Sequence, residues 1–169
     1  MDAMEAIFSR RSIRKFSSKP IPEHLVTELL RAAMAAPSAG NEQPWSFIII
    51  TERAILDAIP QFHPYTAMLK HAPMAILVCG DLSLERNKGY WVQDCSAATE
   101  NLLIAATAKG LGAVWTGVYP MHDRIAGMRK LLNLPDQVMP LALVPIGYST
   151  EKPGRADRFN PERVHRERW

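Results

Sequence analysis

Apolar residues recur along the chain with two different periods, which predict a mixture of helices and strands. Within residues 22–34 the apolar positions fall at i, i+3 and i+4 spacing, which is typical of an amphipathic helix. The unbroken apolar run at 47–50 is instead typical of a strand covered on both faces. The expected helices cover residues 2–9, 22–34, 53–59, 64–71, 90–109 and 121–132. The expected strands cover residues 45–51, 74–80, 113–118 and 141–148.

Two segments do not fit a self-contained fold. The longest expected helix, 90–109, is apolar around most of its circumference, whereas a surface helix shows one apolar stripe. We therefore expect this helix to be packed against other parts of the protein on nearly all sides, and a subunit interface could supply part of that packing. Residues 150–169 have few apolar side chains and no clear period, so this segment cannot order itself alone. It is interpreted as a frayed tail or as an arm on another surface, and Trp169 favours the arm. The expected division is one domain, 1–169, ending in a C-terminal arm, 150–169.

Composition restricts the class of protein. A chain of 169 residues with 47% apolar and 22% charged residues is typical of one soluble globular domain. The two cysteines, Cys79 and Cys95, lack the spacing of a disulfide framework or a zinc site, so a reducing cytoplasm is the expected location. No window is apolar enough to span a membrane, and the first residues lack an apolar signal region. We therefore expect no membrane contact. The five histidines are scattered without metal-ligand spacing, so we also expect no bound metal.

Common catalytic and binding motifs are missing. Gly110–Gly112 resembles the start of a dinucleotide fingerprint, but Trp115 occupies the third glycine position and a helix precedes the strand, which is the reverse order. The chain contains no Walker loop, no His-Glu-x-x-His and no Gly-x-Ser-x-Gly. Nucleic-acid binding is disfavoured because the net charge is only +3 and no aromatic residues interleave the basic clusters.

A cluster of three arginines near the N-terminus is the strongest chemical signal. Arg10, Arg11 and Arg14 fall within five residues. Guanidinium groups this close repel one another unless an anion lies among them, and their planar fork of donors matches the geometry of a phosphate. The cluster therefore indicates a phosphate site, with a solvated basic surface as the alternative.

A polar loop at 37–43 offers groups for a flat ligand. Ser38 carries a hydroxyl, and Asn41 and Gln43 carry amides, which both donate and accept hydrogen bonds. This combination suits a heterocycle that alternates C=O and N–H along its edge, such as the pyrimidine edge of a flavin. The alternative is an ordinary turn between a helix and a strand.

Four blocks of sequence together resemble the FMN-dependent nitroreductases. They lie at residues 10–16, 36–45, 110–117 and 145–155. Each block alone is weakly specific, but the four occur in the family order and extend over nearly the whole chain. The chain lacks the inserted segment with which some members of that family shape the substrate pocket.

The resemblance implies an α+β fold with a mainly antiparallel (mixed) sheet of about four strands flanked by helices. It also implies a homodimer with two FMN sites at the interface and a C-terminal arm exchanged with the partner subunit. The implied phosphate and ribityl contacts are Arg10, Arg11, Ser12 and Arg14, with the basic pair Lys152 and Arg155. The implied flavin contacts are the loop residues Pro37, Ser38, Ala39, Asn41 and Gln43 of the partner, and the strand residues Trp115, Thr116 and Gly117.

The activity implied by the resemblance is electron transfer from NAD(P)H, through FMN, to a small electron-poor acceptor such as a nitroaromatic or a quinone. Because both substrates would use one cavity in turn, ping-pong kinetics are expected, with NAD(P)H bound only transiently. No dedicated acid or base is evident, so no catalytic side chain is predicted and protons would come from solvent. The alternatives are a flavin-fragmenting or specialised biosynthetic enzyme of the same fold, and a flavin-binding module without turnover.

Overall fold

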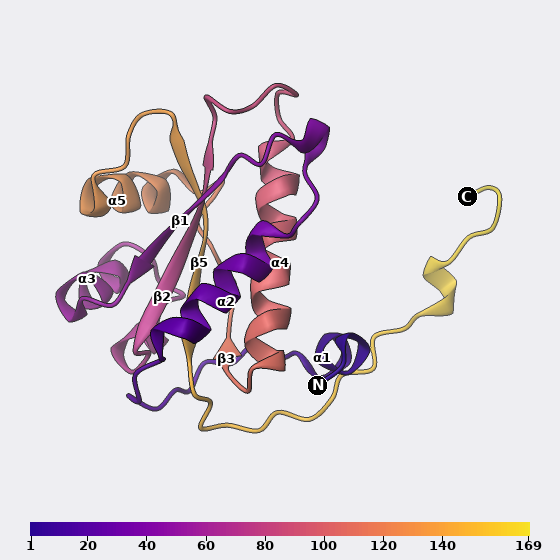
Figure 1. Cartoon of the computed structure of the whole chain (residues 1–169), viewed down its shortest axis with the longest axis horizontal. Helices are drawn as coiled ribbons and strands as arrows, with labels where there is room; N and C mark the ends of the chain where they lie inside the picture. Colours follow the sequence, from indigo (N-terminus) through magenta and orange to yellow (C-terminus); the bar gives the residue numbers. More distant parts are fainter.

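The computed structural model describes all of residues 1–169 and contains a five-stranded antiparallel sheet between two layers of helices (Figure 1). The strand order is β1-β2-β5-β3, and β4 also pairs with β5. The strands are β1 (Trp45–Ile50), β2 (Met74–Asp81), β3 (Gly112–Ala113), β4 (Thr116–Gly117) and β5 (Val138–Gly147). The mainly antiparallel α+β fold is therefore confirmed, with the parallel bridge between Ser12 and Ala113 as an isolated exception.

Helices α2 and α4 pack together on one side of the sheet, and α3 and α5 lie on the other (Figure 1). The α-helices are α1 (Ala3–Ser9), α2 (Glu23–Met34), α3 (Arg53–Ala58), α4 (Trp91–Ala108) and α5 (His122–Leu132). Short 3₁₀ turns are η1 (Ala39–Asn41), η2 (Ile59–Gln61), η3 (Ala67–Lys70) and η4 (Pro161–Arg163). The expected helix at 64–71 is wrong: only η3 forms there, because the amides of Leu69 and His71 bond to carbonyls three residues back.

The expected strand at 113–118 is divided into β3 and β4, which is why the sheet has five strands and not about four. Ala113 pairs with Ile146 and Thr116 pairs with Leu143, so both pieces keep one register against β5. The break lies opposite Pro145, which has no N–H to donate to the ladder. The amide of Val114 still bonds to the Pro145 carbonyl at 3.3 Å.

Strand β1 corrects a second expectation. Its apolar run predicts a strand covered on both faces, but β1 is an edge strand that pairs only with β2. Ile49 is 42% exposed, and Phe47 and Ile48 are half-buried. The expectation holds instead for β2, which lies between β1 and β5 and is buried from Met74 to Gly80.

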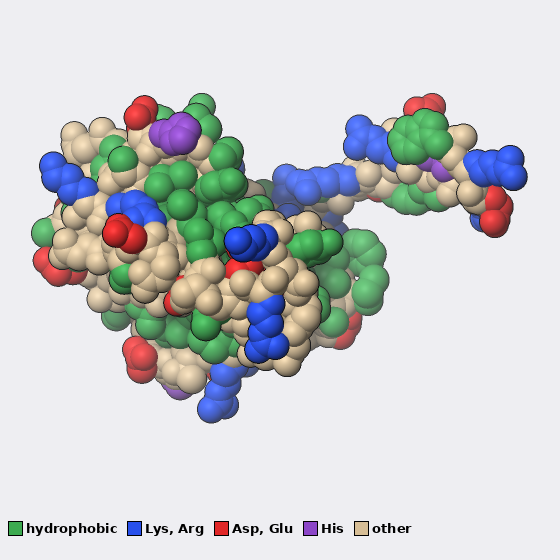
Figure 2. Space-filling view, turned by 90° about the horizontal axis from the view of Figure 1, so that it is seen from above, with side chains coloured by type: hydrophobic (Ala, Val, Ile, Leu, Met, Phe, Trp, Pro, Cys, Tyr) green, Lys and Arg blue, Asp and Glu red, His purple; other side chains and the backbone are tan.

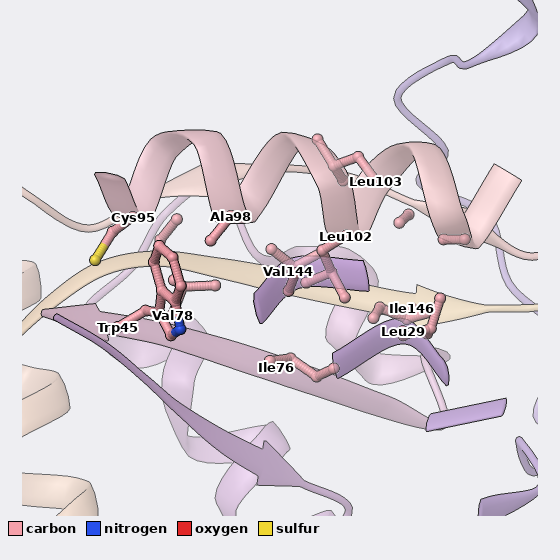
Figure 3. Close-up of a cluster of buried hydrophobic side chains, with 14 of the residues drawn as sticks. Leu29, Trp45, Ile76, Val78, Cys95, Ala98, Leu102, Leu103, Val144 and Ile146 are labelled. Carbon is pink, nitrogen blue, oxygen red and sulfur yellow. The ribbon is translucent and has the colours of Figure 1, made fainter. Parts of the chain in front are cut away.

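The main core lies between α4 and the sheet (Figure 3). Cys95, Ala98 and Leu102 of α4 point toward Val78 and Val144 of the sheet (Figure 3), and all five side chains are fully buried. The opposite face of α4 is less covered, since Gln93 and Glu100 are exposed and Ile104 is half-buried. One chain therefore covers most, but not all, of this helix.

Both ends of the chain expose apolar side chains. Helix α1 buries only Ala6, whereas Met4, Ile7 and Phe8 are 56%, 46% and 59% exposed. Residues 156–159 lie beside α1, and the segment after them extends away from the body and forms only the short turn η4 (Figures 1 and 2). Phe159 and Trp169 are exposed.

Candidate functional site

The side chain of Arg14 lies at a cavity of about 390 Å³ beside the short strand β4. The guanidinium forms no ion pair, so its charge is available to an anion. No atom lies within 4 Å of the position that a Cβ on Gly117 would take, so a flat ring could approach this backbone closely. The residues that line the cavity are Arg14, Pro64, Tyr65, Ala67, Met68, Trp115, Thr116 and Gly117. The structure thus brings Arg14 together with the predicted strand residues.

Backbone contacts place Arg14 independently of its own side chain. The carboxylate of Glu151 accepts the amide N–H groups of Arg14 at 2.6 Å and Lys15 at 3.2 Å. On the other side, the amide of Ile13 donates to the Ala113 carbonyl at 3.0 Å. The arginine segment is therefore held between β3 and the chain that follows β5.

The three guanidinium groups of the basic cluster point to different partners. Arg10 Nε lies 3.2 Å from Glu100 Oε1 on α4, and Arg11 donates to the carbonyl of Gly154. Arg11 therefore lies against the segment that carries Lys152 and Arg155, both of which are exposed. Ser12 is also exposed and forms the isolated bridge to β3. Arg11 thus contacts the basic segment, Arg10 is turned toward α4, and Arg14 lines the cavity beside β4.

Three residues of the loop 37–43 have a left-handed backbone conformation. Gly40, Asn41 and Gln43 all have positive φ angles, 55°, 53° and 48°, a conformation that is uncommon for residues other than glycine. Ser38 Oγ accepts the Gln43 amide at 3.0 Å, and the two side-chain amides bond to each other, Gln43 Nε2 to Asn41 Oδ1, at 2.9 Å. Backbone strain of this kind is frequent in segments that bind ligands. Asn41 and Gln43 are exposed, so their amides remain accessible.

Two buried carboxylates bond this loop to neighbouring segments of the fold. Asp94, 4% exposed in the first turn of α4, accepts the Ala39 amide at 3.0 Å. Glu42, 7% exposed, accepts the amides of Arg86 at 2.6 Å and Asn87 at 3.0 Å. Because these bonds join the loop to α4 and to residues 86–87, they hold its conformation in place before any ligand arrives.

Within one chain the loop does not join the Arg14 cavity. None of its residues lines that cavity. The loop is bonded to Asp94 near the start of α4, whereas Arg11 shares a surface hollow with Thr107 near the helix end. Thirteen residues of helix separate these two points, a distance of about 20 Å. The predicted loop and basic cluster are thus at opposite ends of α4.

Tyr65 and Met68 belong to the cavity wall but carry no recognisable pattern in the sequence. Tyr65 lies in the irregular connection between η2 and η3, and Met68 lies in η3, where no binding motif distinguishes them from their neighbours. Only the fold, which places this connection opposite β4, identifies them.

A larger cavity of about 600 Å³ lies elsewhere, at the end of the edge strand β1. It contains none of the predicted site residues. One of its two cationic side chains, Arg53, is already used: it donates to the carbonyls of Leu69 and Ala72 and pairs with Asp57 at 3.0 Å, which leaves Lys70. We therefore place the functional site at the smaller Arg14 cavity.

The cysteines are structural. Burial raises the pKa of both Cys79 and Cys95 to about 12, so neither thiol ionises near neutral pH. Cys95 Sγ lies 3.5 Å from the Cys79 carbonyl, to which it donates. The structure contains no group of three His, Cys, Asp or Glu side chains that could hold a metal ion. None of its helices is both long and apolar enough to span a membrane.

His63 gives the first testable prediction. Its side chain is fully buried and both ring nitrogens lack a hydrogen-bond partner. Burial, and secondarily the charge of Arg124, lower the pKa of His63 below its ordinary value of about 6.5. Below about pH 6.5 the His63 imidazole is therefore protonated more readily in the unfolded chain than in the folded chain, so the free energy of unfolding falls as the pH drops. We expect His63→Phe to reduce the loss of Tm between about pH 7.5 and pH 5.5.

The matched control is His122→Phe at an exposed position of α5. Differential scanning fluorimetry at both pH values measures the effect. If Tm falls by the same amount between the two pH values in wild type and in His63→Phe, His63 does not contribute to the loss of stability in acid.

Comparison with known proteins agrees with this geometry. The model of the nitroreductase family matches residues 7–148. A Methanothermobacter thermautotrophicus protein named as an NADH dehydrogenase/NAD(P)H nitroreductase is 53% identical over all of this chain and 88% of its own length. A Parabacteroides distasonis structure of the same name is 45% identical, with a TM-score of 0.95 over 99% of this chain and 98% of that one. A Desulfovibrio desulfuricans nitroreductase solved with FMN is 28% identical, with a TM-score of 0.86 over 100% and 98%.

Proposed function

This chain belongs to the nitroreductase family, and from that premise we propose that it is an FMN-dependent oxidoreductase. It takes electrons from NAD(P)H and passes them to an electron-poor acceptor such as a nitroaromatic or a quinone, by a ping-pong mechanism. The observation that carries this proposal is the Arg14 cavity, where an unpaired guanidinium lies beside the open backbone of Gly117. A relative with FMN bound and relatives named for NAD(P)H support the choice of cofactor and reductant.

The residues fit an FMN molecule in three respects. An FMN phosphate carries close to two negative charges, and Arg14 and Arg11 with the exposed Lys152 and Arg155 offer the cations to offset them. The open face of Gly117 leaves space for a flat ring. The amides of Asn41 and Gln43 match the alternating donors and acceptors of a pyrimidine edge. When bound, FMN would supply the redox chemistry: it would take a hydride from NAD(P)H and pass the electrons on to the acceptor.

The chain's own residues bind and orient, and none is assigned a proton-transfer role. Arg14 anchors the phosphate end, so the ring end would lie along Trp115–Gly117. The cavity is open to solvent on the side of Tyr65, which is 67% exposed, and protons are available there from water.

Steady-state kinetics test this function. Initial rates with NADH or NADPH and a nitroaromatic such as nitrofurazone should give parallel double-reciprocal lines, as one shared site requires. Repeated aerobic turnovers should return the full oxidised FMN spectrum each time. Progressive loss of that spectrum would support flavin fragmentation instead, and tight FMN binding without NAD(P)H oxidation would support a binding module.

We infer further that the protein is a homodimer in which each FMN site takes its loop 37–43 from the partner subunit. Three observations support this: the loop and the basic cluster lie at opposite ends of α4, α1 exposes an apolar face, and the segment after Phe159 forms hydrogen bonds only within itself. A second copy would cover α1 and the outer face of α4, and would give the C-terminal arm a surface.

A heterodimer experiment tests the shared site. Arg14→Ala subunits are co-expressed with Asn41→Ala/Gln43→Ala subunits under different affinity tags. If each site uses Arg14 of one chain and the loop of the other, the heterodimer has one site with both lesions and one intact site. We expect one FMN per heterodimer at the wild-type Kd, measured by flavin fluorescence. Two weakened sites and no intact one would mean that each site is built within a single chain.

Asp94 gives a prediction about loop support. Asp94→Ala removes the acceptor for the Ala39 amide and should weaken FMN binding by about 1 kcal/mol, the usual net value of a hydrogen bond. Asp94→Asn keeps an oxygen at this position and serves as the control. Titration of apo-protein with FMN measures both. Equal Kd values for wild type and Asp94→Ala would show that the loop does not need this bond.

A further inference from the structure

Arg124 of α5 touches two separate walls of the Arg14 cavity. Its Nη1 donates to the Gly117 carbonyl at 2.7 Å, and its guanidinium carbon lies 5.1 Å from the centre of the Tyr65 ring. Gly117 and Tyr65 both line the cavity, whereas Arg124 does not. One side chain outside the cavity thus connects strand β4 with the irregular connection after η2.

Both walls need such a support. Strand β4 contains only two residues, and although Gly117 pairs with Ala142 of β5, glycine has the largest backbone freedom of any residue type. Thr116 is fixed by its own hydroxyl, which donates to the Leu143 carbonyl at 2.7 Å. Tyr65 is two-thirds exposed, so packing holds its ring only weakly. A guanidinium can donate to a carbonyl and stack on an aromatic ring at the same time, which an ammonium group does less well.

The surroundings keep Arg124 as a lone charge behind this wall. Burial, and after it the charge of Arg124, lowers the pKa of the fully buried His63 imidazole. The imidazole is therefore neutral near pH 7 and does not repel the guanidinium.

We propose that Arg124 is a positioning residue that fixes the Gly117 backbone and the Tyr65 ring as one rigid wall for the flavin and for a planar aromatic acceptor. The inference rests on the proposed function, since it assigns the wall of that same site. Arg124 contacts neither ligand and acts through the two residues that do. Tyr65 then supplies the flat surface on which an aromatic acceptor stacks, which favours planar acceptors over compact ones such as ferricyanide.

A double-mutant cycle tests the coupling. FMN Kd values are measured by fluorescence quenching for wild type, Arg124→Gln, Tyr65→Leu and the double variant. We expect Arg124→Gln to weaken FMN binding about tenfold and the double variant to be only slightly weaker than Arg124→Gln alone, because coupled residues are not additive. Arg124→Lys, which keeps the charge and one donor, should recover part of the affinity. The KM for nitrofurazone should rise in Arg124→Gln more than the KM for ferricyanide.

Arg129→Gln is the matched control on the same helix. Arg129 also bonds to carbonyls, those of Asp136 at 2.7 Å and Val138 at 3.0 Å, but does not line the Arg14 cavity. It should lower Tm without changing the FMN Kd. If Arg124→Gln does not fold, Arg124→Lys and Tyr65→Leu complete the cycle.

Two outcomes separate failure of this inference from failure of the proposed function. The inference alone would be overturned if the wild type binds FMN and the Arg124 variants bind it with the same Kd. It would also be overturned if the losses of FMN affinity in the cycle are fully additive. Wild-type protein that binds no FMN would overturn both.

Discussion

Replacing Arg14 by alanine should weaken FMN binding by about 1.5–3 kcal/mol, the range for a hydrogen bond to a charged group. This corresponds to a rise in Kd of about 10- to 150-fold. The guanidinium forms no ion pair in the chain, so its loss removes a ligand contact and no structural one. The backbone at Arg14 stays bonded to Glu151, and the apo-protein should therefore keep its fold and its Tm.

The comparison with Arg10→Ala sharpens this expectation. The Arg10 guanidinium pairs with Glu100, and such a partly exposed pair contributes about 0–1 kcal/mol. Arg10→Ala should therefore alter FMN affinity less than Arg14→Ala, although both remove one charge from the same cluster. Titration of apo-protein with FMN at two salt concentrations measures both. Equal losses would mean that only the net charge of the cluster matters, and no loss in Arg14→Ala would contradict the phosphate assignment.

Replacing Gly112 by alanine should have the largest effect on folding among the site-related changes. A Cβ at Gly112 would lie 2.6 Å from Cγ2 and 2.9 Å from Cβ of Ile13. Ile13 is buried and its amide is bonded to Ala113, so it cannot move away freely. We expect a loss of about 1–3 kcal/mol in the free energy of unfolding, as is usual for overpacking. FMN affinity should also fall, because Ile13 carries the backbone of the arginine segment.

A second substitution tests the cause. Ile13→Ala removes Cγ2 and Cγ1, which would lie 2.6 Å and 3.0 Å from the new Cβ, so the stability lost through Ile13→Ala should be smaller in the Gly112→Ala background than in the wild type. Urea unfolding of the four proteins in this cycle measures the coupling between the two positions. Purely additive losses would show that the contact between residues 112 and 13 is not the source of the destabilisation.

The parts of the fold that the sequence predicts well are those whose patterns are local. The apolar stripe of α2 and the fully apolar β2 identify their elements within a residue or two. Strand β1 is equally apolar but lies at an edge, because the position of a strand in a sheet depends on pairing partners far away in the chain. The break between β3 and β4 depends on Pro145, about thirty residues further on, which no local pattern reveals.

The candidate site divides in the same way. Arg14 and Gly117 belong to recognisable blocks, and the structure brings them to one cavity. Tyr65 and Arg124 carry no signal, because their roles come from a contact between a loop and a helix that only the folded chain creates. The loop 37–43 is recognisable by its amides, but its separation from the Arg11 hollow within one chain follows only from the length of α4.

The most direct measurement is an anaerobic titration of the FMN-loaded wild-type protein with NADH and, separately, with NADPH, followed by absorbance near 450 nm. We expect stoichiometric loss of the oxidised flavin band with at least one of the two nucleotides, and its full return when nitrofurazone or a quinone is added. A protein that binds no FMN, or whose bound FMN keeps its oxidised spectrum in excess NADH and NADPH, would contradict an NAD(P)H-dependent FMN oxidoreductase.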